Sequence, residues 1–354
     1  MCDFSAYGGA SKEWLAVEAT LPPPPPANLS ALERRAVTNA WREKNAAEGM
    51  RELAGKVRLV DYAIPTRDGS TVEARTYRAV DATDTVTPLY IHLHGGGYLF
   101  GTLASEDDVC AGLTLRTGVV VLNVNYRHTP EHVYPTAWHD VQDALVWVHA
   151  HAESLNIDPQ RIVVGGISAG AHLAASLVLE QHLGRLPVAL PPLAGQVLMI
   201  PCVVNAYCYA PQLAQLTDPA VSSVRENADA PILPMRTMLF FTDLVMAGQT
   251  ADPADTNLNP GNATPEQVRG LPPTVFGICG LDPLRDEGFL YAKKLAEAGV
   301  PTDVHLFKGV PHGFRRYGTE MSVAKAWDEV MEQGILWAVS KPAAMGRFDI
   351  KVHT

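Results

Sequence analysis

The chain has 354 residues, of which 47% are hydrophobic and 19% are charged, as is usual for a globular protein. Its net charge is −10, from 28 basic and 38 acidic residues, and it contains no long run of lysine or arginine. This charge balance argues against nucleic acids and anionic membranes as main partners. No apolar run approaches the roughly 20 residues that span a bilayer. Residues 1–10 lack the pattern of a secretion signal, so we expect a cytoplasmic location.

Five cysteines are present, an odd number without the spacing of metal ligands. Cys202 and Cys208 are close enough in sequence to form a disulfide, but reduced core thiols are expected in a cytoplasmic protein. The sequence therefore predicts neither a disulfide framework nor a metal site.

The first 55 residues have a helical pattern that differs from the chain after them. A short helix is predicted at residues 11–18, and five prolines at 22–26 predict stiff polyproline II. Ser30 and Glu33 have the spacing of a capping box, which begins a helix that continues to residue 50. We interpret these residues as helices that lie over a larger core, not as an independent domain.

From residue 57 onward, strand and helix patterns alternate along the chain. Helices of this length between strands predict an α/β protein with a mainly parallel sheet that is covered on both faces. The expected strands are 57–64, 72–77, 87–94, 119–126, 161–164, 193–200, 274–279 and, as the last, 303–307. The expected helices are 105–117, 140–151, 171–180, 285–298 and 320–340.

The segment 201–270 interrupts this alternation. It is too long for a structureless loop in a compact domain, so we expect a lid that forms a cap with residues 1–55. The core is then 56–200 with 271–341, and 342–354 is a tail. One helical stripe in the lid fits either packing onto the core, which we favour, or the lining of an apolar pocket. The stripe contains Met235, Met238, Leu239, Phe240, Phe241 and Met246.

One serine lies between two glycines at a predicted corner between a strand and a helix. Ser168 is the centre of Gly166-Ile-Ser-Ala-Gly170, preceded by the strand 161–164 and followed by the helix 171–180. Small residues two positions before and after the serine allow a sharp turn that holds its hydroxyl clear of the sheet. The first amides of the helix then face any negative charge that forms beside the hydroxyl. This arrangement predicts a nucleophilic serine.

Three consecutive glycines follow the strand 87–94. In His94-Gly95-Gly96-Gly97 the glycines let backbone N–H groups face a small anion. With the N–H of Ala169 they predict a three-donor oxyanion hole. A phosphate-binding loop is the alternative, but it requires a following Lys-Ser or Lys-Thr, or the Gly-x-Gly-x-x-Gly spacing, and neither is present. We interpret His94 as a residue that orients this loop.

A nucleophilic serine also needs a histidine base. Among the 12 histidines, His312 lies in a turn-rich loop directly after the last predicted strand, and we select it as the base. His172 lies four residues past Ser168 in a helix that carries it away from the hydroxyl. His305 lies inside the last predicted strand, and His353 lies in a tail without a packing signal.

The acid that orients the histidine is expected on the loop after the preceding strand, 274–279. Two aspartates follow that strand, Asp282 and Asp286. Asp282 is closer to the strand end, whereas Asp286 is expected in the first turn of the next helix, where an acid caps. We favour Asp282, which gives the chain order serine, aspartate, histidine.

Several motifs now coincide: His94-Gly-Gly-Gly-Tyr98, Tyr126-Arg127 with Pro130-Glu131, Gly166-Ile-Ser-Ala-Gly170, Asp282-Pro-Leu-Arg-Asp286 and His312-Gly-Phe314. Together they resemble the hormone-sensitive-lipase-like family of carboxylic ester hydrolases, over about residues 57–340. The resemblance implies an eight-stranded α/β-hydrolase core with a helical cap. It implies short or medium acyl esters as substrates and no cofactor or metal. It also implies these roles: Ser168 as nucleophile, His312 as base, Asp282 as orienting acid, and Gly96, Gly97 and Ala169 as oxyanion hole.

The sequence departs from this family in two places. Ile167 stands before the serine, where the family commonly has aspartate or threonine, and His128-Thr129 stands where it often reads Leu-Ala. Two other functions stay open: a dehydratase, cyclase or acyl transferase on the same scaffold, or a ligand-binding protein resembling the gibberellin receptors, which lack the base. The complete serine, histidine and aspartate set argues against the second. The sequence does not decide between a monomer and a homodimer.

Overall fold

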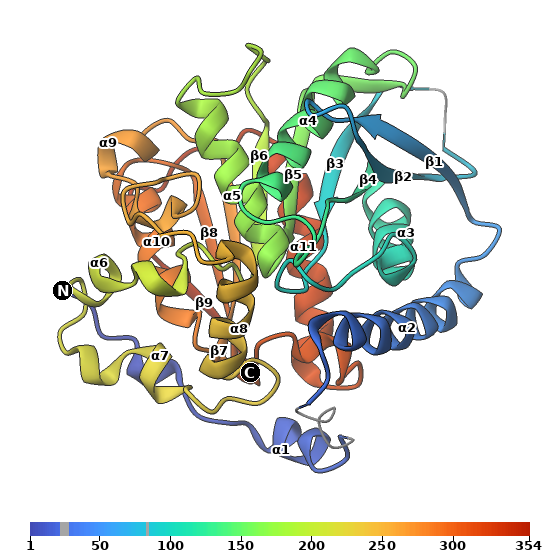
Figure 1. Ribbon diagram of the computed structural model, residues 1–354. Helices are drawn as coiled ribbons and strands as arrows, with labels where there is room; N and C mark the ends of the chain where they lie inside the picture. Colours follow the sequence, from blue (N-terminus) through green and yellow to red (C-terminus); the bar gives the residue numbers. More distant parts are fainter. Residues whose placement is uncertain (22–27, 83–84) are drawn as a thin grey trace.

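The computed structural model describes residues 1–21, 28–82 and 85–354, so the polyproline II segment predicted at 22–26 lies outside the described residues. Its centre is a nine-stranded sheet of order β1-β2-β4-β3-β5-β6-β7-β8-β9 (Figure 1). β1 and β2, joined by a tight turn, pair antiparallel, as do β2 and β4, and the other pairs are parallel. The strands are β1 Val57–Pro65, β2 Thr71–Ala79, β3 Thr87–Leu93, β4 Val120–Asn125, β5 Ile157–Ile167, β6 Gly195–Met199, β7 Thr274–Leu281, β8 Thr302–Pro311 and β9 Ile350–His353.

Helices cover both faces of this sheet, because side chains along each central strand alternate between two apolar layers. In β3, Leu89, Ile91 and Leu93 belong to one buried cluster, whereas Tyr90 belongs to the other. The first cluster includes α4 (Thr136–Ala150), α5 (Ala169–His182) and α10 (Arg285–Glu297). The second includes α3 (Asp107–Thr117) and α11 (Ser322–Val339). The predicted α/β fold class is confirmed.

The remaining helices lie outside this core. They are α1 (Lys12–Glu18), α2 (Ala31–Gly49), α6 (Ala210–Leu213), α7 (Ser223–Glu226), α8 (Met235–Met246) and α9 (Pro265–Val268). Figure 1 shows α1, α2, α7 and α8 along the lower side of the molecule in that view. The predicted capping box at the start of α2 is confirmed by bonds between Ser30 and Glu33. Residues 1–7 reach the 201–270 segment, where Cys2 exchanges backbone hydrogen bonds with Gln215 and Thr217. The division into core and cap stays a prediction.

The end of the chain differs from the expectation. The sheet has nine strands, not eight, because β9 pairs in parallel with β8 within the segment 342–354 that was predicted as a tail. His353 packs there, stacked on the rings of His305 and Phe307. β8 is therefore not the last strand. The four residues of β9 are too few to show a strand pattern in the sequence.

Candidate active site

The corner between β5 and α5 holds Ser168 in a backbone conformation that is rare for a residue with a side chain. Its φ is 56° and its ψ is −117°, and such strain is found mainly at functional sites. The flanking glycines are required by close packing. A Cβ atom on Gly166 would lie 2.2 Å from the carbonyl oxygen of Leu93, and one on Gly170 would lie 1.9 Å from it. The glycines thus let the corner press against the end of β3.

The three side chains that the sequence predicts as a catalytic set, Ser168, His312 and Asp282, meet at the carboxyl ends of the parallel strands. Oγ of Ser168 lies 2.8 Å from Nε2 of His312, whose Nδ1 lies 2.7 Å from Oδ2 of Asp282. Asp282 directly follows β7 and His312 directly follows β8. A carboxylate that accepts a hydrogen bond from Nδ1–H leaves Nε2 as the acceptor for the serine hydroxyl. The arrangement can remove a proton from Ser168 and return it to a leaving group.

Asp286, the alternative acid, binds elsewhere. Its carboxylate accepts hydrogen bonds from the amide of Ser223 at 2.7 Å and from Nε of Arg285 at 2.9 Å. It lies in the first turn of α10, as expected, but it binds the first residue of α7. Its hydrogen bonds therefore tie α7 to the core and do not include the histidine.

The glycine loop after β3 packs around His94, which is fully buried. The imidazole stacks on the ring of Tyr126 at 4.5 Å between centroids and lies 3.3 Å from Oδ1 of Asn125. Burial lowers the pKa of His94 to about 4, so the ring is neutral at pH 7. The hydroxyl of Tyr126 donates to the His94 carbonyl at 2.7 Å. These contacts suit a residue that orients the loop.

Three backbone amides at this loop and at the corner lack a protein acceptor. Within the described part of the chain, the N–H groups of Gly96, Gly97 and Ala169 donate no hydrogen bond to another protein group. Gly96 has a φ of 146°, a conformation open to glycine alone, and a Cβ there would lie 2.2 Å from the Phe100 carbonyl oxygen. Ala169 directly follows Ser168, and the glycine loop packs against the residue before it, since a Cβ on Gly95 would lie 2.8 Å from the Ile167 carbonyl oxygen. Free amides so placed can form the donor set that an oxyanion requires.

The unusual residue before the serine is half-buried and apolar in its contacts. Ile167 packs against the buried cluster on the α3 and α11 side of the sheet, and its carbonyl oxygen would lie 2.8 Å from a Cβ on Gly95. Both the backbone and the side chain of Ile167 therefore pack against the glycine loop. The other departure from the family pattern, His128, lies with its ring tilted against those of His94 and Tyr126, with 5.2 Å between ring centroids in each pair.

The apolar stripe of α8 divides between two roles. Met238 and Met246 are buried, and Met238 packs with Leu233 and Leu284, as expected for packing onto the core. Phe241 instead lies directly against the glycine loop. Its ring carbons are 2.4–2.6 Å from the position of a Cβ on Gly97, and its ring meets that of Phe100 edge-on. One side chain of the stripe thus borders the proposed oxyanion site.

Sequence reasoning missed one set of polar residues, on α2. Arg35, Asn39, Arg42 and Glu43 contact the loop 95–102 from one helix face. Their spacing of four, then three, then one residue is the available signal, since polar residues that repeat on one helix face can mark a docked surface. A charged face is usually solvated, so the pattern alone could not name its partner.

No candidate metal site or membrane span is found among residues 1–21, 28–82 and 85–354. No group of three or more histidine, cysteine, aspartate or glutamate side chains there could hold a metal ion. In the same residues, no helix combines the length and apolarity needed to cross a membrane. All five cysteines are free thiols.

Known proteins are similar to this chain in sequence and in fold. A family model described as an alpha/beta hydrolase fold matches residues 90–316. Esterase LipI of Mycobacterium tuberculosis is 32% identical over 282 residues, which cover 79% of this chain and 81% of LipI. A solved bacterial heroin esterase has a TM-score of 0.78 and 28% identity, covering 94% of this chain and 99% of the heroin esterase. Vibralactone cyclase has a TM-score of 0.86 and 30% identity, covering 96% of this chain and 98% of the cyclase.

The chain is a member of the α/β-hydrolase family, and the resemblance to its hormone-sensitive-lipase-like branch is confirmed. It is an enzyme of a hydrolase family whose relatives include named esterases.

Proposed function

We propose that this protein is a serine carboxylesterase that works through an acyl-enzyme. The observation that carries the proposal is the line of hydrogen bonds from Ser168 through His312 to Asp282, at 2.8 and 2.7 Å. Three free amides beside the serine support it, as do esterase relatives such as LipI and the ethyl acetate hydrolase of Pseudomonas putida. Small esters of short or medium acyl chains are the proposed substrates.

The geometry suits two successive acyl transfers. His312 takes the hydroxyl proton while Oγ of Ser168 attacks the ester carbonyl carbon, and the carbonyl oxygen becomes an oxyanion. The N–H groups of Gly96, Gly97 and Ala169 would bind that oxyanion. Collapse breaks the bond to the alcohol oxygen, which receives the proton from His312. Water then attacks the acyl-enzyme with His312 as base again, and the carboxylic acid leaves.

Ser168→Ala is the direct test. The variant should fold normally but lose hydrolysis of p-nitrophenyl acetate and butyrate, because no other hydroxyl replaces the nucleophile. A sulfonyl fluoride should add once to the natural protein, at Ser168, and not to the variant, as read by mass spectrometry. Ser176→Ala is a matched control, since this serine of α5 binds Asn257 and lies two turns away. Unchanged turnover by Ser168→Ala would refute the proposal.

A second candidate is a cyclase, favoured by the similarity to vibralactone cyclase over 96% of this chain. On the same acyl-enzyme, a hydroxyl of the bound acyl group would replace water as the attacking group. Isotopic water distinguishes the two reactions. Hydrolysis places one oxygen from H₂¹⁸O in the carboxylic acid, whereas cyclisation of a hydroxy ester places none in the product.

A further inference from the structure

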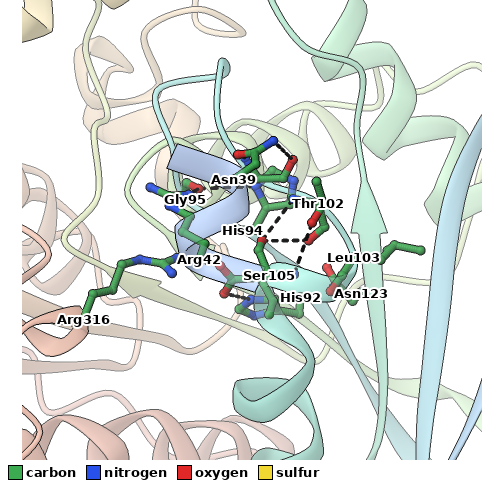
Figure 2. Close-up of polar contacts among 12 residues, drawn as sticks. Asn39, Arg42, His92, His94, Gly95, Thr102, Leu103, Ser105, Asn123 and Arg316 are labelled. Carbon is green, nitrogen blue, oxygen red and sulfur yellow. Dashed lines mark hydrogen bonds and ion pairs between the residues drawn. The ribbon is translucent and has the colours of Figure 1, made fainter. Parts of the chain in front are cut away.

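The Arg42 side chain of α2 contacts the backbone of the glycine loop. Its NH1 group donates to the carbonyl oxygen of Gly95 at 2.9 Å, and Figure 2 shows the guanidinium beside that residue. This carbonyl and the N–H of Gly96 belong to one peptide unit. In a trans peptide the C=O and N–H bonds point in opposite directions. The N–H of Gly96 therefore points away from Arg42.

The same helix fixes the position of Arg42. Asn39, one turn earlier, donates to the carbonyl of Gly101 at 3.3 Å and accepts from its amide at 2.9 Å. Glu43 accepts from the hydroxyl of Thr102 at 2.7 Å. Since these bonds lie on either side of Arg42 in sequence, the guanidinium is held in register with the loop.

A partly buried charge network adjoins the guanidinium. Arg42 lies over the ring of Phe100, 5.6 Å from its centroid, and Arg316 lies close by. Burial and the charge of Arg316 lower the pKa of Arg42 to about 9, so the group stays protonated at neutral pH. Glu106 is fully buried, binds Arg316 at 2.5 Å and lies 3.3 Å from His92. Arg316 and His92 hold the pKa of Glu106 far below its usual value despite its burial, and its negative charge compensates the two arginines.

We propose that Arg42 is a positioning residue for the oxyanion hole, which fixes and polarises the Gly95–Gly96 peptide so that the N–H of Gly96 faces the reacting carbonyl. The inference rests on the proposed function. A charged donor on the carbonyl draws electron density from the amide, which makes its N–H a stronger donor. It also prevents rotation of the peptide, which would turn the N–H away and present a carbonyl oxygen to the oxyanion.

Arg42→Met removes the donor and keeps an apolar side chain against Phe100. We expect kcat for p-nitrophenyl butyrate to fall by about 10- to 100-fold, less than the roughly 10²–10³ that complete loss of one oxyanion donor costs. KM should stay within about twofold, because the contact that is weakened, from the N–H of Gly96 to the oxyanion, forms only in the transition state. The Ki of a butyl trifluoromethyl ketone, whose adduct with serine carries the oxyanion, should rise by the same factor as kcat falls. Arg42→Lys should restore most of both.

Two control variants separate this role from simple docking of α2. Arg35→Met removes bonds to the Leu99 carbonyl and to Glu131 but leaves the Gly95 peptide bound, so its loss of kcat should be clearly smaller at a similar loss of Tm. Lys44→Met alters an exposed residue on the far side of the helix and should change neither value.

The outcomes are distinguishable from those of the proposed function. If Ser168 is labelled and esters are cleaved, but Arg42→Met changes neither kcat nor the Ki of the ketone, the inference is wrong and the esterase stands. Equal losses of kcat in Arg42→Met and Arg35→Met would also overturn it. If Arg42→Met does not fold, Arg42→Lys decides. A folded lysine variant that keeps most of kcat and most of the affinity for the ketone supports charge-assisted positioning, whereas one that loses kcat with an unchanged Ki of the ketone overturns it.

Discussion

Nδ1 of His312 lies 2.7 Å from Oδ2 of Asp282, while the other oxygen of that carboxylate accepts the amide of Leu284 at 2.9 Å. The aspartate is 1% exposed. Both oxygens are thus held in place, and the carboxylate fixes which ring nitrogen carries the proton.

Asp282→Asn should lower kcat by about 10⁴, because an amide at this place favours the wrong histidine tautomer. Steady-state rates of p-nitrophenyl acetate hydrolysis measure the loss of kcat. Asp286→Asn is the matched control: it should lower Tm, because the amide loses the ion pair with Arg285 and has one acceptor oxygen for the two donors, and it should largely keep kcat. Equal losses of kcat in the two variants would show that Asp282 is not the orienting acid.

Phe241→Ala should widen the space above the glycine loop. The ring lies against Gly97 and Phe100, so its loss leaves room beside the proposed oxyanion site. We expect kcat/KM for a bulky ester, such as a naphthyl butyrate, to rise relative to that for ethyl butyrate by about 10-fold. This is the discrimination between substrates that a change of one or two methylenes in an apolar pocket typically produces. Phe240→Ala removes the neighbouring ring, which lies beside Arg34, and should leave the ratio unchanged. A constant ratio in Phe241→Ala would contradict this placement.

Gly170→Ala should disrupt the corner at Ser168. The added Cβ would lie 1.9 Å from the backbone oxygen of Leu93, which cannot move without shifting β3. We expect a loss of more than about 2 kcal/mol in the free energy of unfolding, within the range for overpacking. In Gly112→Ala the new Cβ meets only the movable end of Arg116, and a helix gains up to about 1 kcal/mol from such a change. Urea unfolding measures both, and equal stability of the two variants would be the contrary result.

Buried His172 should make stability depend on pH. Its Nε2 lies 2.9 Å from the carbonyl of Leu258, and burial lowers its pKa to about 4. Folding therefore favours the neutral ring, a contribution that is complete above the unfolded pKa of about 6.5 and declines as pH falls toward 4. The stability advantage of the natural protein over His172→Gln should shrink by on the order of 3 kcal/mol between pH 7 and 4. A difference that is constant with pH would show that the ring does not titrate in this range.

The parts of the molecule that the sequence predicts are those set by local patterns. The strand and helix alternation predicts the sheet, and short motifs select Ser168, Asp282 and His312, which the structure places together. Boundaries moved where a pattern is weak: α4 begins at Thr136, before the predicted residue 140, and β5 extends to Ile167. Contacts between distant segments leave no local pattern, so the bond from Arg42 to Gly95 and the ring of Phe241 on Gly97 required the structure.

The order of the strands has a consequence for folding kinetics. Ser168 follows β5 and His312 follows β8, with β6 and β7 between them in the sheet, and the two residues are 144 positions apart in sequence. The two side chains can meet only after all four strands have paired, and contacts of such separation form slowly because long loops must close first. Recovered ester hydrolysis during refolding should therefore lag behind the return of helical circular dichroism. Enzyme activity is in this sense a probe of the completed sheet.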